Sequence, residues 1–165
     1  MTLEELNILE SSEAAALFTG CCHCERWVIE METSRPFKSE VNLLETAELL
    51  WANSTESEKL EAFTGHPRIG DMDALRNKYA ASANREQGQI VGADNKVLAL
   101  LRDQNQRYLD LYGFIFIVCA TGKSAVEMLG LLAQRLGNDR ETELDNAARE
   151  QAAITRLRLQ KLVED

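Results

Sequence analysis

Apolar residues recur along most of the chain at the spacing of one face of an α-helix. Trp27, Val28 and Met31 fit this period, and a longer set runs from Leu43 to Trp51. Three Ser/Thr-x-x-Glu sequences predict helix starts, because the hydroxyl and the glutamate of such a capping box satisfy free backbone N–H groups. These sequences begin at Thr2, Thr55 and Ser124.

Breakers and caps set the expected helix boundaries. Gly20 is expected to stop a helix that begins at Ser11 or Ser12. Pro36 separates the next two helices, because proline disfavours helical backbone at the residue before it. Gly113 is expected to end a long helix. The further helices are predicted near residues 39–51, 72–79, 94–112, 124–136 and 141–162.

One apolar run departs from the helical period. It extends from Phe114 to Cys119 and indicates a buried extended segment. A single segment of this kind cannot form a sheet by itself. We therefore predict an all-α fold of seven to nine packed helices with one buried extended connector. No internal repeat or linker interrupts the pattern, so residues 1–165 are expected to form one domain.

The charge and the apolar content narrow the range of partners. The chain carries 18 Lys and Arg against 27 Asp and Glu, which gives a formal net charge of −9. So acidic a chain is poorly suited to a polyphosphate backbone, and no nucleic-acid partner is expected. No apolar run approaches the ~20 residues of a membrane helix, and no secretory signal opens the chain. We therefore expect no membrane partner.

Three of the four cysteines crowd one short segment. Cys21, Cys22 and Cys24 surround His23, whereas Cys119 lies far along the chain. Adjacent side chains on a helix diverge by about 100°, and zinc ligands normally come in two separated pairs. Buried thiols are therefore favoured over a metal site, although a weak metal site stays open. The layout also makes a poor disulfide framework, which favours a reducing cytosol.

A second segment imitates a nucleotide-binding loop. Gly122, Lys123 and Ser124 follow the apolar run and precede a predicted helix. A P-loop also needs a glycine five positions before its Gly-Lys pair, and this chain has the β-branched Ile117 there. A loop followed by a helix cap is the favoured interpretation, and ATP binding is the alternative.

The loop after the fifth expected helix holds the residues best suited to proton transfer. His66 is one of only two histidines. Pro67 next to it restricts the backbone, and Gly70 allows backbone angles that other residues avoid. Imidazole titrates near neutral pH, so His66 could act as a positioned general acid or base. The alternative is a structural histidine, with Pro67 in the first turn of a helix. The polar residues 84–87 follow about twenty positions later and alone indicate only a solvated surface.

Taken in order, these segments resemble the 2-oxo-4-hydroxy-4-carboxy-5-ureidoimidazoline (OHCU) decarboxylases. The His66 loop, the pair Glu86 and Gln87, and the apolar connector are the main points of similarity. The resemblance covers almost the whole chain. The similar segments are residues 26–28, 35–37, 66–70, 86–87, 112–118, 132–138 and 154–159.

The resemblance implies an all-helical decarboxylase of urate degradation that needs no cofactor and no metal. Such an enzyme converts OHCU to (S)-allantoin with release of carbon dioxide. Members of this family are homodimers. The bacterial-type His-Pro-Arg-Ile-Gly loop, and the lack of a C-terminal Ser-Lys-Leu-like address, point to the cytoplasm.

The resemblance also assigns roles to single residues. His66 and Glu86 are expected to be catalytic, with His66 as the main acid-base group and Glu86 as its partner. Arg158 is expected to anchor an anionic or carbonyl group of the substrate, with Arg156 as the competitor. Backbone groups of the connector are expected to bind the planar ring. The expected substrate-binding residues are Pro67, Ala83, Asn84, Arg85, Glu86, Gln87, Phe116, Ile117, Val118, Cys119, Ala120 and Arg158.

Two positions depart from the family pattern. Ala83 stands where relatives often have serine, so only a backbone contact could survive there. Thr121 stands where many relatives carry arginine, so that charge is absent. The alternative from another functional class is a non-catalytic helical binding or interaction module, which would bind no product of purine breakdown.

Overall fold

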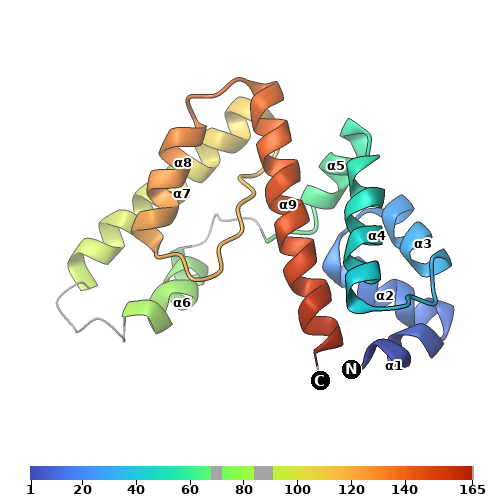
Figure 1. Ribbon diagram of the computed structural model, residues 1–165. Coiled ribbons are helices and arrows are strands. Elements are labelled where there is room, and N and C mark those ends of the chain that lie inside the picture. Colours follow the sequence, from blue (N-terminus) through green and yellow to red (C-terminus); the bar gives the residue numbers. More distant parts are fainter. Residues whose placement is uncertain (68–71, 84–90, 165) are drawn as a thin grey trace. The chain divides into compact units, whose positions relative to one another are not determined.

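The computed structural model describes residues 1–67, 72–83 and 91–164 (Figure 1). These residues form nine helices and no strand, so the all-α prediction is confirmed for the described chain. None of these helices is both long and apolar enough to span a bilayer. The helices are α1 Leu3–Ile8, α2 Ser11–Cys21, α3 Glu25–Thr33, α4 Glu40–Ala52, α5 Glu56–Phe63, α6 Met72–Ala83, α7 Val91–Tyr112, α8 Ala125–Arg135 and α9 Arg140–Val163.

The chain divides into two compact units. The first comprises Met1–His66, Ile117–Cys119 and Ala148–Asp165, and the second comprises Pro67–Phe116 and Ala120–Ala147. The long helix α9 contributes its first two turns to the second unit and the rest to the first. The expectation of a single domain stays a prediction.

Aromatic residues hold the first unit together. Phe18 and Trp27 are fully buried, with an edge-to-face contact at a centroid distance of 6.2 Å. The Trp27 indole donates to the carbonyl of Ala47 at 3.1 Å, which ties α3 to α4. The Trp51 indole donates to the carbonyl of Ala148 at 2.9 Å, so α4 lies beside α9 (Figure 1). Buried aromatic bodies with satisfied N–H groups thus join distant segments.

The Arg35–Pro36 break has a clear structural role. Arg35 Nη1 donates to the carbonyls of Leu6 and Leu9 at 2.9 and 2.8 Å. These carbonyls lie at the end of α1, where helical partners are missing. The Arg35–Pro36 peptide is cis, and helix α3 ends before it, as predicted. This family-like segment therefore stabilises the first unit.

The structure confirms the predicted caps and corrects three helix boundaries. All three capping boxes are present, and Ser39 also caps its helix. Gly20 does not stop α2, which continues to Cys21, because the buried face of Ala14, Phe18 and Cys21 continues through that turn. Burial of the side chains around Gly20 outweighs its low helix propensity. Helix α6 likewise extends past residue 79, and α7 begins at Val91 rather than residue 94.

The connector and the loop after it match their predictions in part. Gly113 has φ +82° and ends α7, as expected. Residues 114–120 form neither helix nor strand. Phe114, Phe116 and Ile117 are buried, whereas Ile115 and residues 118–120 are only half-buried. The segment that resembles a P-loop forms a turn followed by a helix cap. The Ser124 hydroxyl makes this cap by accepting from the Glu127 N–H.

Candidate active site

His66 lies in the first unit, immediately after α5. Its backbone N–H donates to the carbonyl of Phe63 at 3.2 Å, so it continues the turn that closes the helix. Gly65 permits this path. A Cβ at Gly65 would lie 2.4 Å from the Cβ of His23, which is closer than real Cβ contacts. A glycine is therefore required where this turn meets the cysteine-rich segment.

The imidazole of His66 contacts a buried glutamine on α9. Nε2 of His66 lies 2.5 Å from Oε1 of Gln151, whose side chain is fully buried. Nε2 of Gln151 donates to the Thr155 hydroxyl at 3.0 Å, and that hydroxyl donates to the carbonyl of Cys21 at 3.4 Å. Cys21 is the last residue of α2, where carbonyls lack helical partners. His66 is thus linked to a helix end through two buried side chains.

The environment of His66 keeps its ring neutral. Burial lowers the pKa of His66 below the ordinary 6.5, and the nearby charge of Arg158 lowers it further, while the hydrogen bond to Gln151 opposes the shift. Removing water penalises the charged imidazolium more than the neutral ring. At pH 7 His66 is therefore a neutral imidazole, which can accept a proton.

Arg158 lies within electrostatic reach of His66, and Arg156 has another partner. Nη1 of Arg158 donates to the carbonyls of Gly20 and Cys21, both at 3.3 Å. The C-terminal end of a helix attracts cations, so this end of α2 holds the guanidinium in place. Nη1 of Arg156 instead pairs with Glu48 of α4 at 2.5 Å. Among the described residues, the structure therefore brings Arg158 and not Arg156 to His66.

The cysteine-rich segment borders the same carbonyl. Cys21, Cys22 and Cys24 are buried, as predicted. Burial raises the pKa of Cys21 to about 11 and that of Cys22 to about 12, so both are thiols at neutral pH. Cys22 also makes a hydrogen-bonding contact with Thr155. Within the described parts of the chain, no group of three or more His, Cys, Asp or Glu side chains is arranged to hold a metal ion.

The predicted connector residues are divided between the two units. The Phe116 ring belongs to the second unit, where it lies 5.3 Å from the Tyr108 ring and 4.8 Å from the Arg135 guanidinium carbon. The backbone N–H of Cys119 donates to Oε2 of Glu150 at 3.0 Å, so this donor already has an acceptor in the first unit. A ring bound along the connector would have to share or replace that contact.

Most of the remaining predicted site residues lie outside the described parts of the chain. Pro67 is exposed and begins the second unit. Ala83 is the last residue of α6. The predictions for Asn84, Arg85, Glu86 and Gln87 lie outside the described residues. Their assignments therefore stay predictions.

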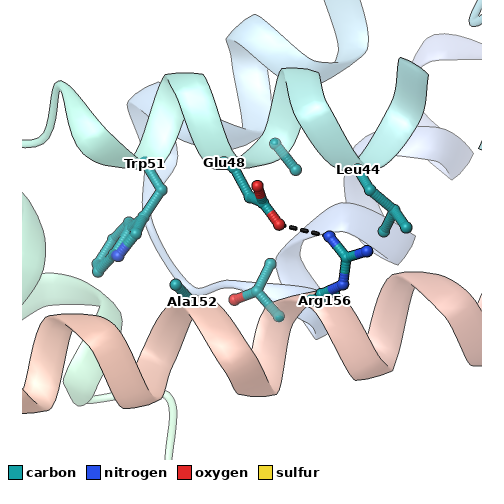
Figure 2. A pocket seen from close by; sticks show the side chains of 7 residues that line it. Leu44, Glu48, Trp51, Ala152 and Arg156 are labelled. Atoms are coloured by element: carbon teal, nitrogen blue, oxygen red, sulfur yellow. Dashed lines mark hydrogen bonds and ion pairs between the residues drawn. The ribbon is translucent and has the colours of Figure 1, made fainter. Parts of the chain in front are cut away.

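A pocket between α4 and α9 is separate from His66. Figure 2 shows Leu44, Glu48 and Trp51 on α4 facing Ala152 and Arg156 on α9, with the Glu48–Arg156 ion pair between the helices. Ala47 and Thr155 complete the lining. The lining is mostly apolar and includes neither His66 nor Arg158, so the pocket does not offer the acid-base chemistry of the His66 site.

The sequence reasoning did not single out Gln151 or Thr155. Both lie on the buried stripe of α9, whose other members are apolar except for Glu143 near its start. A polar residue on a mostly apolar helix face is the sequence feature that could have pointed to them, because a buried amide or hydroxyl needs a hydrogen-bond partner. The other buried members of this stripe are Glu143, Leu144, Ala147, Ala148 and Leu159.

Comparisons with known proteins identify the family of the chain. The family profile of OHCU decarboxylase matches residues 7–160. The chain is 36% identical to the uric acid degradation bifunctional protein TTL of Arabidopsis thaliana over 88% of this chain and 46% of that protein. It is 33% identical to the 2-oxo-4-hydroxy-4-carboxy-5-ureidoimidazoline decarboxylase of Amia calva over 60% of this chain and 58% of that protein. The chain spans less than half the length of the bifunctional relatives that it matches.

Solved structures give the same result. A crystal structure of OHCU decarboxylase in the presence of (S)-allantoin matches with a TM-score of 0.75 and 32% identity. The match covers 95% of this chain and all of that chain. An (S)-allantoin synthase structure shares the fold, with a TM-score of 0.73 at 19% identity. The chain belongs to the OHCU decarboxylase family.

Proposed function

We propose that this protein decarboxylates OHCU to (S)-allantoin without a cofactor, with His66 as the acid-base group. The observation that carries the proposal is the environment of His66, a half-buried neutral imidazole next to Arg158. Family membership supplies the substrate class. A neutral imidazole beside a fixed guanidinium suits a substrate that carries both a hydroxyl proton and a carboxylate.

The reaction can proceed on the substrate's own functional groups. Loss of carbon dioxide leaves the electron pair of the broken C–C bond on the ring carbon that bears the hydroxyl. The adjacent ring C=N bond accepts this pair, and its nitrogen takes a proton, which gives an enol. The enol hydroxyl then loses its proton while the neighbouring carbon gains one, so the products are allantoin and carbon dioxide. This electron sink lies within the substrate, so the protein has to orient groups and move protons.

The described residues divide these tasks. His66 accepts the hydroxyl proton, because its lowered pKa keeps the ring unprotonated at neutral pH. Arg158 orients the carboxylate, since its described hydrogen bonds use only Nη1, and Nη2 and Nε belong to the same planar fork. Proton delivery to one face makes the product chiral. Glu86 remains the proposed partner of His66 in this step, and Gln87 the proposed contact to the ureido group.

The assembly and compartment are also proposals. We propose a homodimer in the cytoplasm. The four cysteines are all free thiols, which suits a reducing compartment. Light scattering coupled to gel filtration tests the dimer, and a mass of one chain at micromolar concentration would contradict it. Fractionation of the source cells with a cytoplasmic marker tests the compartment.

The activity is tested by generating the substrate in place, because OHCU decays by itself. Urate oxidase and hydroxyisourate hydrolase convert urate to OHCU, and circular dichroism then follows optically active allantoin. We expect rapid growth of the (S)-allantoin signal with the wild-type protein. His66→Ala should lose roughly 10²- to 10⁴-fold in rate, the usual contribution of a general acid-base group.

His23→Ala serves as the matched control, because His23 is the other histidine and is exposed. Slow formation of racemic allantoin with both the wild type and His66→Ala would contradict the decarboxylase proposal. The non-catalytic binding module would then be the better interpretation. Binding of (S)-allantoin, measured by calorimetry, separates the two proposals, because a non-catalytic interaction module should bind none.

A further inference from the structure

We infer that Gln151, held by Thr155, is the positioning residue that fixes His66 in its Nε2–H tautomer and so leaves the lone pair on Nδ1. The inference concerns the state of the ring, and its catalytic consequence rests on the proposed function. The observation that carries it is a directional hydrogen-bond chain in the first unit. The chain runs from His66 through Gln151 and Thr155 to the carbonyl of Cys21.

The direction of the hydrogen-bond chain follows from its far end. The carbonyl of Cys21 can only accept, so the Thr155 hydroxyl donates its single proton to it. That hydroxyl can then only accept from Gln151, which must present its NH₂ group to Thr155. The amide oxygen of Gln151 therefore faces His66, and this oxygen can only accept. Nε2 of His66 must carry the hydrogen.

Burial makes this arrangement costly to reverse. Gln151 is fully buried and Thr155 is 5% exposed, so water does not replace a lost partner. Rotating the amide of Gln151 by 180° would set its NH₂ group against the N–H of His66, so the ring tautomer and the Thr155–Cys21 hydrogen bond would both have to change with it. A buried polar group that loses its hydrogen-bond partner destabilises the folded state. The amide orientation is therefore fixed, and the ring tautomer with it.

The anchor of the hydrogen-bond chain also holds Arg158. Nη1 of Arg158 donates to the same Cys21 carbonyl at 3.3 Å. The end of α2 thus positions both the tautomer of His66 and the cation beside it. With a neutral ring and a hydrogen on Nε2, Nδ1 is the atom that accepts a proton.

The ring state can be read by NMR without any substrate. Long-range ¹H–¹⁵N correlation at pH 8 distinguishes a protonated pyrrole-type nitrogen from an unprotonated pyridine-type nitrogen. The chain has only two histidines, so His23→Gln leaves His66 as the single imidazole. We expect Nε2 to be pyrrole-type and Nδ1 pyridine-type in this background. The opposite pattern, or a mixture of both tautomers, would overturn the inference.

Variants of Gln151 test its role. Gln151→Met keeps the length of the side chain but removes the acceptor, so both tautomers should appear. Gln151→Glu restores an acceptor and should restore the Nε2–H tautomer, with a higher pKa of His66 because a carboxylate now faces the ring. Gln160→Met is the matched control on the same helix and should leave the spectrum unchanged. An unchanged tautomer in Gln151→Met would overturn the inference.

A second pair of variants protects against loss of folding in Gln151→Met. Thr155→Ser keeps the hydroxyl and should keep the wild-type tautomer, whereas Thr155→Val frees the amide to rotate and should give a mixture. Far-UV circular dichroism and the melting temperature establish that each variant is folded. The same single tautomer in folded Thr155→Val as in the wild type would contradict the role of Thr155.

Kinetics then separate this inference from the proposed function. If both hold, Gln151→Met should lower kcat by about tenfold or more with little change in KM, and Gln151→Glu should recover part of the loss. If the tautomer changes but kcat does not, the positioning role of Gln151 stands and the catalytic role of His66 is wrong. If kcat falls while the tautomer stays fixed, the positioning role is wrong.

Discussion

Nε of Arg135 donates a hydrogen bond to Oε1 of Glu143 at 2.6 Å, and the Tyr108 hydroxyl donates to the same oxygen at 2.6 Å. The side chain of Glu143 is fully buried, and that of Arg135 is 11% exposed. Asn138 and Asn146 donate to Oε2 at 2.8 and 2.7 Å. The family-like segment 132–138 therefore supplies two partners of one buried carboxylate, and its role in the second unit is structural.

Removing the charge of Glu143 should destabilise the protein strongly. Glu143→Gln removes the buried carboxylate charge that pairs with the guanidinium of Arg135, and breaking one side of a buried pair typically costs about 3–5 kcal/mol. Urea unfolding followed by far-UV circular dichroism measures the change. Asp145→Asn is the matched control, because this exposed acid lies on the same helix. Equal midpoints for the two variants would show that the buried ion pair adds no stability.

Arg158 and Arg156 should respond differently to the same conservative change. Arg158→Lys keeps the charge but loses the planar fork, so we expect kcat/KM for OHCU to fall by about tenfold or more. Arg156→Lys should leave the rate near that of the wild type, because Arg156 is exposed and pairs with Glu48 away from His66. The coupled circular dichroism assay measures both. A loss confined to the Arg156 variant would move the anion anchor to that residue.

The pH dependence of activity follows from the lowered pKa of His66. Burial and the charge of Arg158 hold that pKa below 6.5, and the hydrogen bond to Gln151 opposes them only in part. A general base must be unprotonated, so the rate should stay level from pH 8 down to about 6.5 and decline only at lower pH. An inflection above pH 7 would contradict this prediction.

The direction in which Arg158 shifts the pKa of His66 can be tested by NMR titration in the His23→Gln background. Arg158→Gln removes a nearby positive charge, so the pKa of His66 should rise. The lowered pKa of His66 also makes the stability of the fold depend on pH. Because the folded-state pKa lies below the unfolded value, this contribution is present above pH 6.5 and is lost as the pH falls through the folded-state pKa. A lower pKa of His66 in Arg158→Gln would refute the electrostatic account.

Two glycines in the first unit should give opposite results when replaced by alanine. A Cβ at Gly65 would meet the Cβ of His23 at 2.4 Å, so Gly65→Ala should shift the turn before His66 and lower both stability and rate. Gly20 is helical and has open space around it, so Gly20→Ala should raise stability by about 0.5–1 kcal/mol. Thermal melts and the activity assay measure both effects. Unchanged stability and rate in Gly65→Ala would contradict the close approach of position 65 to the Cβ of His23.

The local pattern of the sequence was enough to predict most of the helical structure. Capping boxes at Thr2, Thr55 and Ser124 involve residues three positions apart, so their hydrogen bonds can be inferred without tertiary information. The positive φ of Gly113 is equally local. The error at Gly20 arose because burial of neighbouring side chains on α2 outweighed a local preference.

The tertiary structure decided what surrounds His66. The sequence singled out His66 and Arg158, but the glutamine that contacts the ring lies 85 positions away on α9. Cys21, which accepts from Thr155, is 134 positions distant from it. No sequence period links such positions, because the hydrogen bonds form only when α2, α5 and α9 pack together. The sequence alone predicted which residue could transfer protons, whereas packing decided which side chain contacts the imidazole ring and through which nitrogen.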